Sequence, residues 1–255
     1  ISGTVDGAFD LDIITDSAIA GIVGVIGGTT ALATLDINKT AGATGAVTIS
    51  NNIGTTTAAG VTGATLIGNA NTSTLTLAGT VYNANAATYT AAAGGTGNNI
   101  SLTNAAGVTF TSSNDAITFG TSNILLGNGS DLVVNSTGGD ISVVAITGTS
   151  VEDVTLNAAA GNVTVGVIGA ADGQISDVVL TGTTINLGGN ITTDDDADAG
   201  DVDINGNVIL TAAVTIDTSD AGGAVDGTFN ISGTVDGAFD LDIITDSAIA
   251  GIVGV

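Results

Sequence analysis

The sequence predicts an all-β protein, and more specifically a parallel β-helix (β-solenoid) with essentially no helix. Three observations lead to this fold class. Short runs alternate apolar and polar residues with a period of two, as strands with one buried face do. Residues that favour turns, namely Gly, Asn, Asp, Ser and Thr, separate these runs. No stretch combines helix caps with the apolar period of about 3.6 residues that an amphipathic helix requires.

The expected strands follow one another along the whole chain, in the runs 33–38, 46–50, 73–79, 98–104, 107–113, 115–120, 131–135, 140–144, 162–167, 183–191, 201–210, 213–217 and 228–235. In residues 201–217 the alternation predicts these inward side chains: Val202, Ile204, Val208, Leu210, Val214 and Ile216. Strands this short and frequent fit a solenoid with about 20–25 residues per turn. Roughly ten turns, each about 4.8 Å high, would then span about 50 Å.

The composition predicts a narrow aliphatic interior. The chain has 255 residues, of which 44% are hydrophobic, but it contains no Met, Trp or Cys and only seven aromatic residues. We therefore expect a core of Val, Ile, Leu and Ala. Proline is absent, so no proline interrupts a backbone ladder.

The strongest feature of the sequence is a repeat. Residues 1–25 recur letter for letter as residues 231–255, which gives a period of 230. We therefore interpret residues 1–230 as one solenoid unit and residues 231–255 as the start of the next identical unit. A cloning artefact in a repetitive chain is the alternative, and both explanations imply a long repetitive parent protein.

The charge balance excludes several classes of partner. One cation, Lys39, faces 25 acidic residues, and the net charge is −24. Phosphate binding needs Lys and Arg, so we expect no nucleic acid partner and no attraction to anionic membranes. The most apolar run, residues 18–28, is shorter than the roughly 20 residues that span a bilayer. Membrane insertion is therefore not expected.

Two stretches carry a resemblance to a known family. GVIGGTTALATLDIN (24–38) contains a GGTTAL-x-x-L-x-I pattern, and residues 200–243 contain runs of the form G-x-V-x-I-x-G-x-V-x-L. Both resemble giant filamentous-haemagglutinin-like bacterial surface proteins. The resemblance implies a secreted, right-handed β-helix located outside the cell or on its surface, with an adhesion, biofilm or envelope role. It supplies no catalytic residues.

The chain contains few of the residue types that commonly act in catalysis. The chain has no His, Cys or Arg, so a Ser–His–Asp or Cys–His triad is impossible. Paired carboxylates could cleave glycosidic bonds, but a sugar cleft usually has an aromatic lining, and the seven aromatic residues are scattered along the sequence. We therefore expect no catalytic residues and no enzyme.

Calcium is the cofactor that the acidic residues suggest, because Ca²⁺ prefers carboxylate and carbonyl oxygens. The densest acidic run contains the candidate ligands Asp194, Asp196, Asp198 and Asp201. A second candidate is Asp131, because LGNGSDLVV (126–134) resembles a calcium-binding nonapeptide. A third group, Asp6, Asp10, Asp12 and Asp16, could share a bridging cation at a contact between units. The alternative for all three is a hydrated acidic surface.

The sequence as a whole predicts a structural subunit of an extracellular bacterial fibre, sheath or surface coat, built from tandem 230-residue β-solenoid repeats. The expected partners are copies of the protein itself, through end-to-end stacking and lateral bundling, and cell-surface glycans. The alternative is a calcium-dependent adhesin stalk of tandem immunoglobulin-like sandwich domains, two per 230 residues.

Overall fold

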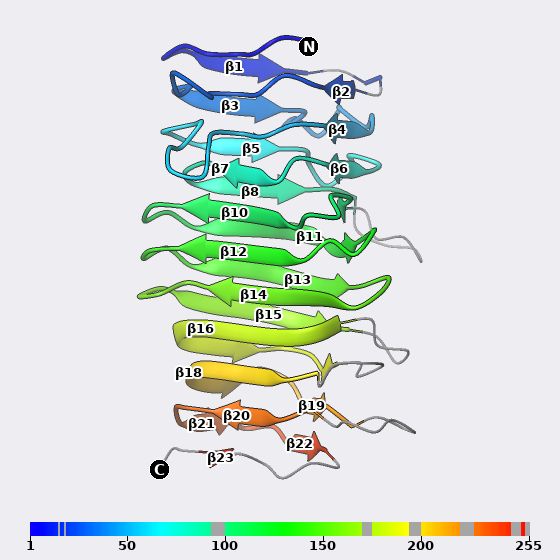
Figure 1. Ribbon diagram of the computed structural model, residues 1–255, viewed down its shortest axis with the longest axis vertical. Coiled ribbons are helices and arrows are strands. Elements are labelled where there is room, and N and C mark those ends of the chain that lie inside the picture. The colour runs from blue at the N-terminus through cyan, green and yellow to red at the C-terminus, as the bar shows by residue number, and fades with distance from the viewer. Residues whose placement is uncertain are drawn as a thin grey trace.

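The chain winds into one continuous stack of parallel turns in the computed structural model (Figure 1). The structure describes residues 1–14, 16–17, 19–92, 100–169, 175–193, 200–219, 227–245 and 251–252. These residues form 23 strands, and the pairings between their strands are parallel. The predicted β-solenoid is therefore confirmed. The alternative of immunoglobulin-like sandwiches is wrong, because the sheets of a sandwich are antiparallel.

Each turn crosses three faces of the stack, which we call faces A, B and C. Face A is formed by β7 (Val81–Asn83), β10 (Val108–Ser112), β12 (Leu132–Ser136), β14 (Glu152–Asn157), β20 (Phe229–Ile231) and β23 (Gly251–Ile252). Face B is formed by β1 (Asp10–Ile13), β3 (Thr34–Ile37), β5 (Thr65–Ile67), β8 (Ala87–Thr90) and β21 (Val235–Gly237). Face C is formed by β2 (Ile19–Ile22), β4 (Val47–Ile49), β6 (Leu75–Leu77), β9 (Ile100–Leu102), β17 (Ile191–Thr192), β19 (Val214–Asp217) and β22 (Leu241–Ile244).

Five longer strands continue round a corner from one face to the next. Two of them pass from face A to face B, namely β16 (Ile175–Leu187) and β18 (Val202–Leu210). Three pass from face B to face C, namely β11 (Ile117–Leu126), β13 (Ile141–Thr147) and β15 (Asn162–Ile168). The described residues contain no helix, and so none that is long and apolar enough to cross a membrane.

The inward side chains of successive turns stack in register, so each face carries a column. The column on face A runs through Val5, Ile26, Ile53, Tyr82, Phe110, Val134, Leu156, Leu180, Ile204 and Ile231. The column on face B runs through Leu11, Leu35, Thr65, Ala87, Ile117, Ile141, Val163, Ile185, Val208 and Val235. The column on face C runs through Val47, Leu75, Ile100, Ile124, Ile146, Ile168, Ile191, Ile216 and Ile243.

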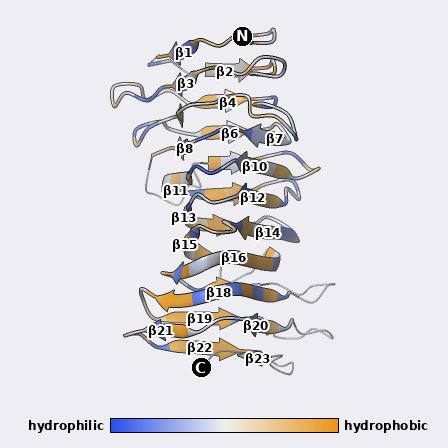
Figure 2. Ribbon diagram, turned by 90° about the vertical axis from the view of Figure 1, so that its left-hand side faces the viewer, coloured by the Kyte–Doolittle hydropathy of each residue, from blue (hydrophilic) through white to orange (hydrophobic). Residues whose placement is uncertain are grey.

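The number of turns follows from the column on face A, which has one member in each turn. Nine steps lead from Val5 to Ile231, so the stack has about nine turns. The strands alternate between hydrophobic and hydrophilic residues, as Figure 2 shows for β18. The side chains that were expected to point inward in residues 201–217 are all buried.

At the corners, glycine allows two turns to approach closely. Gly169 has a φ of +74°, and a Cβ there would lie 2.0 Å from the carbonyl oxygen of Thr192.

The core is not purely aliphatic, which corrects the expectation from composition. Tyr82, Tyr89, Phe110 and Phe119 are fully buried and form one cluster, in which the Tyr82 and Phe110 rings stack with centroids 5.1 Å apart. Phe110 also meets Phe119 edge to face at 4.9 Å. Such pairs contribute about 0.5–1.5 kcal/mol beyond the burial of their area. Four of the seven aromatic residues that looked scattered in the sequence are therefore brought together by the winding of the chain.

Candidate functional site

A column of aspartates stands at the corner that leads into face A. Its members are Asp131, Asp153, Asp177 and Asp201, which are 22 or 24 residues apart. The Oδ1 atom of each of the first three accepts the backbone N–H of the next aspartate, at 3.0, 3.2 and 2.9 Å. The last one, Asp201, accepts the backbone N–H of Thr228 at 2.7 Å. Carboxylates that follow one another along the axis repel one another, so this column ties successive turns together at an electrostatic cost.

The structure places two of the predicted calcium ligands in this column. Asp131 and Asp201 were candidates for separate sites, and they lie three turns apart along it. Asp194, Asp196 and Asp198 lie outside the described residues, so their site stays a prediction. Within the described part of the chain, no group of three or more acidic residues is arranged to hold a metal ion.

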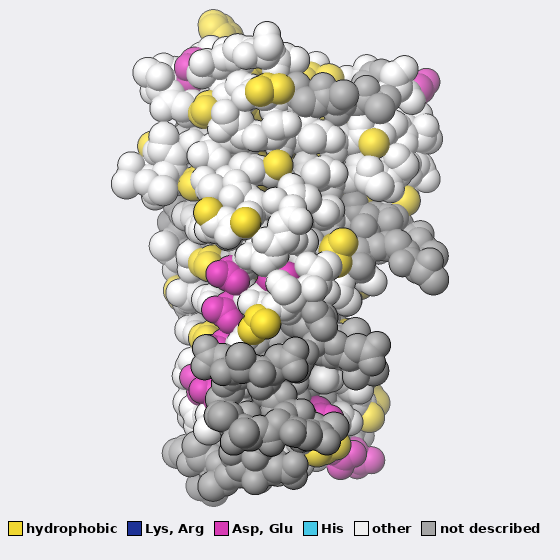
Figure 3. Space-filling model, turned by 45° about the vertical axis from the view of Figure 1, so that its right-hand side comes forward, with side chains coloured by type: hydrophobic (Ala, Val, Ile, Leu, Met, Phe, Trp, Pro, Cys, Tyr) yellow, Lys and Arg dark blue, Asp and Glu magenta, His cyan; other side chains and the backbone are white. Residues whose placement is uncertain are grey.

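Sequence reasoning missed Asp153 and Asp177. A signal was available, because each member of the column directly precedes or enters an alternating run at a spacing close to one turn. Figure 3 shows acidic side chains following one another down the lower half of one face, where no basic side chain is visible beside them.

Asp6 in the first turn is engaged by backbone donors of the second turn. Its Oδ1 accepts the N–H groups of Thr29 at 2.9 Å and Thr30 at 3.1 Å. These two hydrogen bonds hold the pKa of the Asp6 carboxyl below its ordinary value. Asp6 therefore acts as a clamp between two turns.

Asp10 and Asp12 of the first turn also have partners within the chain. The Thr34 hydroxyl donates to Asp10 at 2.8 Å. The Lys39 ammonium is hydrogen-bonded to Asp36 and lies 3.8 Å from Asp12. The hydrogen bond to Asp36 raises the pKa of Lys39. A cation shared by Asp6, Asp10, Asp12 and Asp16 stays a prediction.

Glu152, the single glutamate of the chain, is fully buried at the start of β14. Its two carboxylate oxygens accept the backbone N–H groups of Thr149 at 3.0 Å and Ser150 at 2.9 Å. They also accept the hydroxyl groups of the same two residues, at 3.0 and 3.2 Å. These hydrogen bonds fix the corner between residues 149 and 152. Because both carboxylate oxygens already accept hydrogen bonds, little acceptor capacity remains for a substrate.

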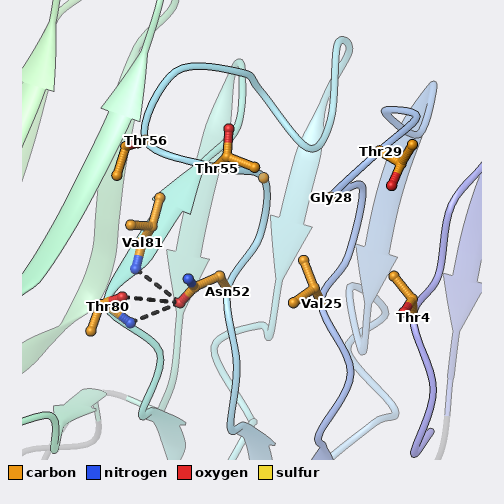
Figure 4. Close-up of a pocket in the computed structure, with 10 residues that line it drawn as sticks. Thr4, Val25, Gly28, Thr29, Asn52, Thr55, Thr56, Thr80 and Val81 are labelled. Atoms are coloured by element: carbon orange, nitrogen blue, oxygen red, sulfur yellow. Dashed lines mark hydrogen bonds between the residues drawn. The ribbon is translucent and has the colours of Figure 1, made fainter.

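A shallow groove of about 520 Å³ runs along the first turns beside residues 54–60 (Figure 4). Its floor includes Thr4, Val25 and Asn52, which occupy the same position in successive turns. The Asn52 Oδ1 is already occupied, because it accepts the backbone N–H groups of Thr80 at 2.9 Å and Val81 at 3.1 Å. The residues that line the groove have no titratable side chain, so the groove can offer hydrogen bonds but no proton transfer.

The two ends of the stack are made by the two copies of the 25-residue repeat (Figure 1). Val5, Leu11 and Ile13 of the first copy are only partly buried, and they pack against the core from one side. Their counterparts Val235, Leu241 and Ile243 do the same at the other end. Each copy also exposes its phenylalanine at a corner, with 78% of Phe9 and 50% of Phe239 accessible to solvent.

Comparison with protein families, with curated proteins and with solved structures finds no match to this chain.

Proposed function

We propose that this chain is a structural subunit of an extracellular bacterial fibre, sheath or surface coat, built from 230-residue β-solenoid units in tandem. The observation that carries the proposal is the position of the repeat. The same 25 residues occur twice in one parallel ladder, and described apolar side chains of both copies pack against the core. Because each copy pairs in parallel with a neighbouring turn, units in tandem would continue one ladder.

The bonding of the carboxylates supports a structural role over a catalytic one. The carboxylates with well-defined partners, such as Glu152 and Asp177, bind backbone donors within the stack. The groove at the first turns is lined by hydroxyl, amide and aliphatic side chains. A net charge of −24 keeps separate rods apart at low ionic strength and is screened in salty surroundings outside the cell.

The test compares proteins of one, two and three tandem 230-residue units by electron microscopy. We expect rods of constant width that lengthen by about 45 Å per unit, because nine turns of about 4.8 Å each contribute that rise. Beads joined by flexible linkers, or compact particles that grow in all directions, would contradict the proposal.

Calcium dependence is a separate part of the proposal. The run that contains Asp194, Asp196 and Asp198 has the spacing and the oxygen ligands that Ca²⁺ uses. Thermal unfolding with calcium and with excess chelator tests it. A Tm that falls on chelation supports a bound ion, and an unchanged Tm removes calcium from the proposal without affecting the fibre.

A further inference from the structure

The two copies of the 25-residue repeat close into the same local turn. In the first copy, the N–H of Val23 donates to the carbonyl oxygen of Ile1 at 2.9 Å, so residues 1 and 23 lie on adjacent turns. In the second copy, Ile231 pairs with Ile252. These are the counterparts of Ile1 and Ile22, so the start of the repeat lies beside the same later residues in both copies.

The two copies nevertheless lie on different faces of the stack. Val5 pairs with Ile26 on face A, whereas its counterpart Val235 pairs with Val208 on face B. Nine turns lead from Val5 to Ile231 on face A, and Val235 lies one face further along the chain.

The rest of the repeat is displaced in the same way. Leu11 pairs with Leu35 on face B, and its counterpart Leu241 pairs with Val214 on face C. Ile22 pairs with Ile49 on face C, and its counterpart Ile252 pairs with Ile231 on face A. The period of 230 residues therefore equals nine turns and one additional face.

Together, the two copies show both neighbours of the same turn. The first copy is paired with the turn that follows it in the chain. The second copy is paired with the turn that precedes it. Superposing them gives three continuous ladders: Val208–Val5–Ile26, Val214–Leu11–Leu35 and Ile216–Ile13–Ile37. In each ladder the strands are parallel on both sides, and an apolar side chain follows an apolar side chain.

We propose that each unit docks on the preceding one in this register, with the first turn of a unit seated on the Val208–Asp217 edge of its predecessor. This inference rests on the proposed tandem fibre and adds its geometry. Each unit is then rotated by one of three faces, a third of a revolution, for a rise of about 45 Å. Only every third unit returns to the same orientation, after about 135 Å.

The register of the second copy can be tested in the 255-residue chain itself. The chain has no cysteine, so an engineered pair has no competitor. Thr215 and Asp242 are paired neighbours on face C with outward side chains, at a separation that a disulfide can bridge. We expect the double variant Thr215→Cys, Asp242→Cys to form an intramolecular disulfide on mild oxidation.

The matched control uses Ile209→Cys with Asp242→Cys. The counterpart of Asp242 is Asp12, which stands in the column of Ile209 on face B, so a whole number of turns per unit would place residues 209 and 242 side by side. Peptide mass spectrometry should find roughly tenfold more disulfide at 215–242 than at 209–242. A preference for 209–242, or no disulfide at either pair, overturns the inference.

Helical reconstruction of a tandem array separates this inference from the fibre on which it rests. We expect a rotation near one third of a revolution for each rise of about 45 Å. A straight rod without that rotation would overturn the docking register and leave the fibre standing. An array that forms no rod would overturn both.

Discussion

Residues 19–92 and residues 108–217 follow the same ladder, but their corners are stabilised in different ways. In the first section, the column on face A advances from Ile26 to Ile53 to Tyr82, and the strands are three or four residues long. In the second section, the column advances from Val134 to Leu156 to Leu180 with fewer residues per turn, and the strands reach 13 residues.

The side chains at the corners differ accordingly. In the first section amides dominate: Asn69 donates to the carbonyl oxygens of Thr40 at 2.9 Å and Ala43 at 2.8 Å. In the second section carboxylates such as Asp177 accept backbone N–H groups. Longer turns carry extra corner residues whose carbonyls need donors, and an amide can both donate and accept, whereas a carboxylate can only accept. In these two sections, the longer turns include amides that donate to corner carbonyls, and the shorter turns include carboxylates and amide oxygens that accept backbone N–H groups.

The largest expected effect comes from removing a ring of the aromatic cluster that joins the two sections. Phe110→Ala should lower the free energy of unfolding by about 3–5 kcal/mol, because it removes a fully buried ring with three aromatic neighbours. Hydrogen exchange should then accelerate most in the turns that contain the cluster, residues 81–92 and 100–126, and less in distant turns, since a solenoid is stabilised by contacts between adjacent turns. Leu156→Ala, within the second section, is the control, and its effect should centre on residues 132–169. Equal acceleration in all the described turns would show that the two sections unfold as one unit.

The second test removes the acid that closes the corner before β14. Glu152→Ala should lower the free energy of unfolding by about 2 kcal/mol, because the corner loses the fully buried carboxylate that accepts four donors of Thr149 and Ser150. Glu152→Gln keeps one acceptor oxygen and should cost less. Denaturant unfolding measures both variants, and equal losses would argue against the role of the donors.

The third test uses pH and acts on the first section and its border. Burial raises the pKa of both Tyr82 and Tyr89 above the ordinary value of 10.0. The stability that depends on neutral tyrosine is therefore complete below pH 10 and falls as the pH rises above it, by about 1.4 kcal/mol per pH unit for each tyrosine.

The matched variant for this test is Tyr89→Phe. Within the described part of the chain the buried Tyr89 hydroxyl has no hydrogen-bond partner, so its removal should cost little at pH 7 and should reduce the alkaline slope by half. Stability measured between pH 8 and pH 11 checks this expectation. A slope unchanged in the variant would mean that Tyr89 does not contribute.

The smallest effect concerns the charges of the aspartate column. Asp177→Asn keeps an acceptor oxygen and removes repulsion from the carboxylates above and below it, so it should stabilise the fold by about 0.5 kcal/mol at low salt. The gain should disappear near 1 M salt, where the Debye length is about 3 Å. Asn52→Asp, in the first section, introduces a charge between uncharged neighbours and should show little dependence on salt. Thermal unfolding across a salt series measures both variants.

The fold class could be predicted from the sequence because a half-buried strand imposes its period of two on the residues. The same rule explains two of the strands that were missed. All three residues of β7 are buried, so Val81–Asn83 shows no alternation, and β14 begins with the buried acid Glu152. The aspartate column and the aromatic cluster could not be predicted, because both depend on which turn each residue occupies. Turns of unequal length hide that register.

The rotation between units changes the direction in which the exposed phenylalanine of each repeat points. If each unit turns by one face, the phenyl ring at Phe9 and its counterparts points in three directions in succession along the filament. Neighbouring filaments could then adhere on any side, and the material would grow as a mat or a three-dimensional weave instead of a flat ribbon.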